Sequence, residues 1–129
     1  MADPLIPDDV QAFLLNRIDS IAQLEALLLL RTNPTHEWTA ETLAKRLYIS
    51  VQETAVLLER LRADGFLVAL PDPPGSYQYQ PASSALAHML DRVADLYTAY
   101  LIPVTNLIHT KPRTRVQEFA DAFKLRKGE

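Results

Sequence analysis

The chain has 129 residues, 48% hydrophobic and 22% charged, a composition typical of one folded domain with a modest core. The absence of cysteine excludes disulfide frameworks, thiolate nucleophiles and thiolate metal sites. The longest purely apolar runs, such as residues 26–30, are far shorter than the roughly 20 residues that cross a bilayer, and the N-terminus lacks a basic region followed by an apolar one. The sequence therefore predicts a cytoplasmic protein with no membrane partner.

Charge is unevenly distributed along the chain. The formal net charge is −3, yet residues 109–129 hold six Lys or Arg against three acidic residues, whereas residues 1–108 hold seven against 13. An acidic body with a basic tail can steer the tail toward nucleic acid, or can dock it on an acidic face of another subunit. The sequence leaves both interpretations open.

Two helices are predicted in the N-terminal third of the chain. Residues 1–19 are expected to form a lead-in helix with apolar residues at helical spacing. Ser20, with Gln23 three residues later, fits a capping box, and an apolar stripe follows it. Pro34 removes a backbone donor and ends this second helix, so a loop and then a short strand at residues 37–39 are expected next.

Two helices joined by a tight turn are predicted between residues 39 and 64. Thr39 caps the first helix, which is about two turns long and ends at Leu47. Ser50 and Glu53 form a second capping box, which begins the second helix. The inward-facing residues of that helix recur at the spacing i, i+3, i+4 and i+7: Thr54, Leu57, Leu58 and Leu61.

A β-hairpin is predicted to follow the second helix. Gly65 stands where the helix must stop, at a position that tolerates positive φ. Apolar and aromatic runs at residues 66–70 and 76–80 flank a turn rich in Pro and Gly. The predicted fold class is mainly α with a small β-hairpin, with a winged helix-turn-helix domain at residues 20–81 and dimerisation helices at both ends of the chain.

Four short runs resemble those of bacterial winged helix-turn-helix transcription regulators, broadly the multiple-antibiotic-resistance and arsenic-repressor type superfamily: Leu43-Ala-Lys-Arg-Leu47, Ile49-Ser50, Leu58-Glu-Arg-Leu61 and Asp64-Gly-Phe-Leu67. The resemblance covers residues 20–80. It implies a homodimer, a recognition helix at residues 51–64 and a wing that touches the minor groove or phosphates.

The exposed side of the second helix carries groups that can read DNA bases. Gln can pair with adenine, Glu can accept from cytosine and Val can contact a thymine methyl group. Phosphate anchors are few, because residues 66–81 hold no Lys or Arg and include Asp72. The candidate DNA-binding residues are Ser50, Gln52, Glu53, Val56 and Arg60, together with Lys45, Arg46, Arg62 and Tyr77.

Two functions from different classes follow from this module. The first is a dimeric transcription regulator that places residues 51–64 of each subunit in the major groove of double-stranded DNA. The second is a non-enzymatic winged-helix adaptor that binds protein without binding DNA, which the acidic body and the absence of Lys and Arg from the wing favour. The sequence does not identify a small-molecule effector.

Residues 82–129 are predicted to form a dimerisation helix and a basic tail helix. Residues 84–102 contain no Gly or Pro and carry a broad apolar stripe, which a second copy of the chain or a fold-back onto its own module would cover. Pro103 ends or kinks this helix. Tyr97 and Tyr100 suit core packing better than effector binding. The predicted interface residues are Leu86, Met89, Leu90, Val93, Leu96, Tyr97, Tyr100, Phe119 and Phe123.

No pattern for catalysis or metal binding is found in the sequence. His36, His88 and His109 have no partner at ligand spacing. Asp91 and Asp95 are one helical turn apart, but no nucleophile or glycine-rich phosphate loop accompanies them. The sequence therefore predicts no enzyme activity, no metal and no cofactor.

Overall fold

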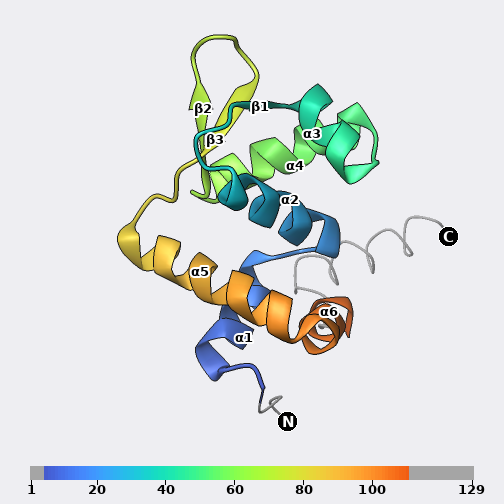
Figure 1. Ribbon diagram of the computed structural model, residues 1–129, viewed down its shortest axis with the longest axis vertical. Helices are drawn as coiled ribbons and strands as arrows, with labels where there is room; N and C mark the ends of the chain where they lie inside the picture. Colours follow the sequence, from blue (N-terminus) through green and yellow to red (C-terminus); the bar gives the residue numbers. More distant parts are fainter. Residues whose placement is uncertain (1–4, 111–129) are drawn as a thin grey trace, which may run out of the picture.

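The computed structural model describes residues 5–110, which contain six α-helices and a small antiparallel sheet (Figure 1). This agrees with the predicted mainly α class, and the sheet contains both strands of the predicted hairpin and the short strand predicted at residues 37–39. The elements in chain order are α1 (Asp8–Arg17), α2 (Ile21–Thr32), β1 (Trp38–Thr39), α3 (Ala40–Leu47), α4 (Val51–Ala63), β2 (Leu67–Leu70), β3 (Ser76–Tyr79), α5 (Ser84–Ala99) and α6 (Leu101–Thr110).

Side-chain caps fix where α3 and α4 begin. The Thr39 hydroxyl accepts the Thr42 N–H at 3.2 Å, and the Thr42 hydroxyl accepts the Thr39 N–H at 2.9 Å. At the start of α4 the Ser50 hydroxyl accepts the Glu53 N–H at 3.0 Å and donates to the Glu53 carboxylate at 3.0 Å. The predicted helix starts after Thr39 and Ser50 are therefore confirmed.

The sheet places a hairpin directly after α4. Its strand order is β1-β3-β2, all antiparallel, and Tyr77 of β3 lies between Ala69 of β2 and Trp38 of β1. Gly65 has a φ of 86°, a conformation that L side chains rarely adopt, and it lets the chain leave α4 and enter β2 within a few residues.

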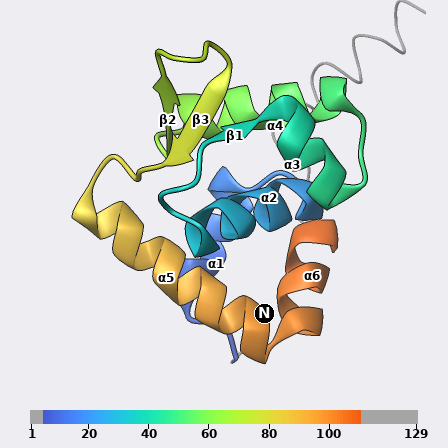
Figure 2. The same cartoon turned by 45° about the horizontal axis from the view of Figure 1, so that its top comes forward.

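The helix α2 lies between the helix-turn-helix α3–α4 and the C-terminal helices (Figures 1 and 2). It contacts α3 and α4 as well as α6, and Leu24, Leu27 and Leu30 are fully buried along it. The helices α5 and α6 also contact α1, and buried apolar side chains from all these elements belong to a single cluster. Burial of this cluster holds the helix-turn-helix on the remaining helices.

The apolar stripe of α5 finds partners within its own chain. Leu90 and Val93 are buried, and four more of the predicted interface residues are half buried against the same core: Leu86, Met89, Leu96 and Tyr97. Tyr100 is exposed, whereas Phe119 and Phe123 lie outside the described residues. Fold-back onto the chain's own core thus accounts for much of the stripe, and contact with a second copy stays a prediction.

The helix predicted at residues 84–102 ends at Ala99, because Pro103 prevents it from continuing. In a continuous helix the Ala99 carbonyl would accept the N–H of residue 103, but proline has no N–H and its ring clashes with that carbonyl. Tyr100 leaves the helical region, with a φ of −133°, and α6 begins at Leu101. Pro103 then occupies the first turn of α6, where no intrahelical donor is needed.

Candidate DNA-binding surface

The helix α4 has one buried side and one exposed side, as its sequence pattern predicts. Thr54, Leu58 and Leu61 are fully buried and anchor the helix to the core. Gln52 is exposed, and Val56 exposes 70% of its surface. The exposed side of α4 therefore presents an amide and a large apolar group, the two kinds of group that can contact adenine and a thymine methyl.

The two arginines of α4 are engaged by acidic side chains. Arg60 pairs with the Asp19 carboxylate at 2.7 Å and with Asp64 at 3.5 Å. Arg62 is hydrogen-bonded to Glu59, and these hydrogen bonds lower the pKa of the Glu59 carboxyl. Since each guanidinium already has a carboxylate partner, both arginines are weaker phosphate anchors than the sequence suggests.

Tyr77 belongs to the same cluster of polar groups. Its hydroxyl donates to the Glu59 carboxylate at 3.2 Å, and burial together with this hydrogen bond raises the pKa of the Tyr77 hydroxyl. This contact ties β3 to α4. Tyr77 was predicted as a DNA contact, and the structure places it as a link between the hairpin and the helix.

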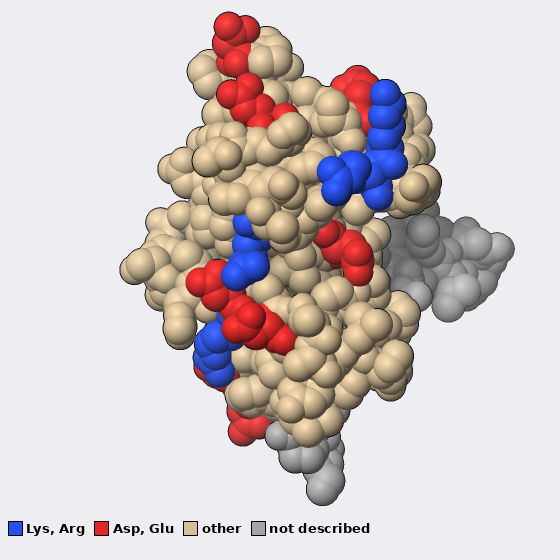
Figure 3. All heavy atoms as spheres, viewed as in Figure 1, with Lys and Arg blue, Asp and Glu red and all other residues tan. Residues whose placement is uncertain are grey.

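Two further exposed cations lie on α3, next to the start of α4. Lys45 and Arg46 occupy its last turn and are both exposed, and the Arg46 guanidinium lies 5.8 Å from the centre of the Trp38 ring. Figure 3 shows basic side chains over α3 and an acidic group at the tip of the hairpin. Positive charge is thus placed next to the start of α4 and not on the hairpin.

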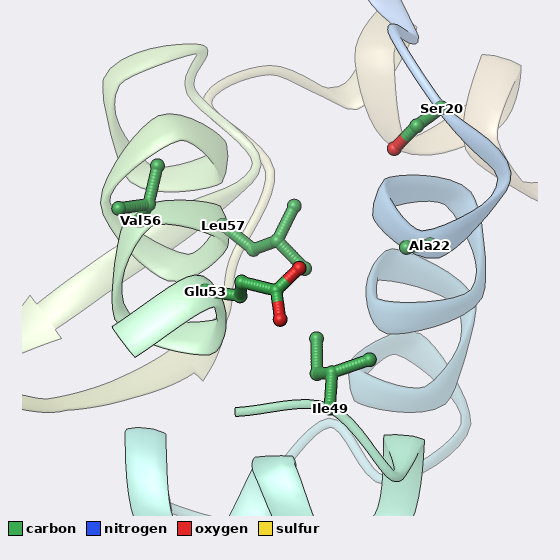
Figure 4. Close-up of a pocket in the computed structure, with 6 residues that line it drawn as sticks. All are labelled: Ser20, Ala22, Ile49, Glu53, Val56 and Leu57. Atoms are coloured by element: carbon green, nitrogen blue, oxygen red, sulfur yellow. The ribbon is translucent and has the colours of Figure 1, made fainter. Parts of the chain in front are cut away.

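A groove between α2 and α4 was not predicted from the sequence. It has a volume of about 320 Å³, and its lining is mainly apolar. Figure 4 shows Leu57 and Glu53 directed from α4 toward Ala22 of α2, with Ile49 between the two helices. Leu57 was expected in the core, but it is only half buried because it lines this groove.

Tyr48, in the turn between α3 and α4, has a backbone conformation that the sequence does not predict. Its backbone is left-handed, with φ 59° and ψ 41°, and no other non-glycine residue within 5–110 has a positive φ. This conformation costs an L residue about 1–2 kcal/mol. The side chain exposes 93% of its surface and so gains almost nothing from packing.

Residues 5–110 contain neither a metal-binding cluster nor a membrane-spanning helix. Among the described residues, no group of three or more His, Cys, Asp or Glu could hold a metal ion. None of the helices in that range has the length and apolar character needed to span a bilayer.

The environment of Tyr97 predicts how the stability of the fold changes at alkaline pH. It lines a hollow between α2 and α5 and donates a hydrogen bond to Glu25, and burial followed by this bond raises the pKa of Tyr97 to about 12. Between the unfolded value of 10.0 and about 12, the folded state retains a proton that the unfolded state releases. This contribution to stability is therefore complete below pH 10 and is lost as the pH rises through about 12.

We expect the absorbance of tyrosinate to rise in a late step near pH 12 that is absent from Tyr97→Phe. Tyr97→Phe should also unfold with a weaker pH dependence above pH 10 than the wild type. A titration of the folded variant that keeps the late step would show that another group is responsible.

Comparison with known proteins adds support for the fold alone. No family model matches the chain, and no curated protein matches it. Among solved structures, the chain is similar to RV1404 from Mycobacterium tuberculosis, with a TM-score of 0.51 and 16% sequence identity over 94% of this chain and 84% of that chain. The similarity and the order α3, α4, β2, β3 are compatible with a winged helix.

Proposed function

We propose that the protein is a DNA-binding transcription regulator that places α4 in the major groove. The observation that supports this most is the exposed side of α4, which carries Gln52 and Val56 in its N-terminal half. Residues near the N-terminus of a recognition helix are the ones that reach base edges. The preceding helix α3 ends in Lys45 and Arg46, so the cations lie where the backbone beside that groove would pass.

The proposed complex has a modest electrostatic component. With Arg60 and Arg62 paired to carboxylates, Lys45 and Arg46 are the main phosphate contacts of each subunit. Each neutralised phosphate contributes a slope of about 0.9 in the dependence of log affinity on log salt. Base contacts from α4 therefore carry a larger share of the affinity than in a strongly basic regulator.

A homodimer is part of the same proposal, because regulators of this kind bind two half-sites about 34 Å apart. Large apolar side chains remain exposed where α5 meets α6, and Ile102 exposes 64% of its surface. Tyr100 and Leu101 are its exposed neighbours, so this junction is the natural contact between two copies.

Selection from a pool of random duplex DNA tests this function. The wild type should enrich a sequence with two related halves, and Gln52→Ala should lose about 1–3 kcal/mol of discrimination at one base pair in each half. Asn106 is exposed on α6, so Asn106→Ala is the control and should enrich the same sequence as the wild type. Failure of the wild type to enrich any sequence at low salt would contradict the proposal.

A second function is favoured by the groove between α2 and α4. Its apolar lining, with Val56 at its rim, suits the apolar face of a helix from a protein partner. A non-enzymatic adaptor would use this groove and would not retain duplex DNA. The pool selection separates the two functions, because the adaptor leaves the pool unchanged.

A further inference from the structure

We infer that Tyr48 is a DNA contact, with its hydroxyl donating to a phosphate oxygen at the edge of the groove that α4 enters. This inference rests on the proposed function and adds to it a contact residue that carries no charge.

The Tyr48 side chain does not contribute to the packing of the fold. Three other tyrosines, Tyr77, Tyr79 and Tyr97, are half buried and pack against the core, whereas Tyr48 exposes 93% of its surface. A large ring in water buries no apolar surface and therefore adds no packing energy. Packing in the core therefore does not explain why a tyrosine stands at position 48.

The backbone at Tyr48 is also unsuited to tyrosine. The left-handed conformation is adopted easily by glycine, and Gly65 and Gly75 occupy the two positive-φ glycine positions of the described chain. Asparagine also tolerates it better than an aromatic residue does. A side chain that neither packs nor suits its backbone points to a role outside the fold.

The surroundings of Tyr48 favour DNA over a protein partner. Lys45 lies one helical turn earlier on α3, Arg46 is its neighbour in the same turn, and both are exposed. Gln52 begins the exposed side of α4 four residues later. A site with two cations on one side and a base-reading amide on the other suits a polyanion that carries bases.

The hydroxyl can contact phosphate in the proposed complex. When the first turn of α4 reaches base edges, the turn that precedes it lies at the rim of the groove, where sugars and phosphates pass. Tyrosine hydroxyls are among the uncharged groups that donate to phosphate oxygens. Because Tyr48 is uncharged, this contact should add affinity without adding to the salt dependence.

Two variants test the role, using the full chain and the duplex that the wild type selects. Tyr48→Phe removes only the hydroxyl and should weaken binding by about tenfold, the effect of losing one hydrogen bond to a charged group. Its salt slope should equal that of the wild type. Tyr48→Asn should weaken binding at least as much while raising the Tm by a few degrees (about 2–8 °C), because asparagine fits the left-handed backbone better.

The outcomes separate this inference from the function on which it rests. Unchanged affinity in both variants, with the wild type still binding its duplex, would overturn the role of Tyr48 and leave the proposed function standing. A Tm that falls in both variants together with affinity would assign Tyr48 to the fold and would also overturn it. If the wild type enriched no duplex from the pool, both the proposed function and the role of Tyr48 would be overturned. Asn106→Ala should match the wild type in affinity, salt slope and Tm.

Discussion

Replacing Leu58 by alanine is expected to lower the free energy of unfolding by about 2–5 kcal/mol, the range for removing a buried leucine. Leu58 is fully buried and belongs to the cluster that joins α4 to the rest of the core. Truncation would leave a cavity beneath α4, and the exposed side of that helix would lose its support. Urea unfolding followed by circular dichroism measures the change.

Val56→Ala is the matched control for this experiment. Val56 lies on the same helix but exposes 70% of its surface, so its truncation should change the free energy of unfolding by less than about 0.5 kcal/mol. Equal effects for the two variants would mean that α4 is turned differently from the structure, with both sides similarly buried.

Removing both cations of α3 should weaken DNA binding strongly. In the double variant Lys45→Ala, Arg46→Ala, two charge-assisted contacts are lost in each subunit, each worth about 1.5–3 kcal/mol, so the affinity should fall roughly 100-fold or more. The slope of log affinity against log salt should become shallower by about 1.8 per subunit, since two phosphates are no longer neutralised. Fluorescence anisotropy at several salt concentrations gives both quantities.

The control for that variant removes the same amount of charge elsewhere. Arg31 and Arg92 pair with Asp91 and Asp9, away from α3, so the double variant Arg31→Ala, Arg92→Ala changes the net charge equally. It should keep most of the wild-type salt slope. If both double variants lower the affinity and the slope alike, the effect is one of overall charge and α3 makes no specific phosphate contact.

Local signals in the sequence predict the helices and the hairpin well. Thr39 and Ser50 are side-chain caps whose hydroxyls act within three residues, and Gly65 marks a positive φ that few other residues adopt. These interactions depend on neighbours in the chain and are visible in any short window. The pairing of β1 with β3 joins residues nearly forty positions apart, and no local pattern contains it.

The candidate site was harder to predict, because one of its arginines is paired with a carboxylate that is distant in the sequence. Arg60 looks like a free cation on the exposed side of α4, but Asp19 reaches it from the segment before α2. Arg62 and Glu59 are three residues apart on one helix, so that pair could have been anticipated. Tyr48 gives no signal of its left-handed backbone, since the usual markers are glycine and asparagine.

The exposed side of α4 is the central element of this account, and amide chemical shifts measured on adding the selected duplex test it most directly. We predict that the largest changes fall in residues 45–57, at the end of α3, the turn and the first half of α4, with small changes in α5 and α6. Changes confined to α5 and α6, with residues 45–57 unaffected, would contradict the account.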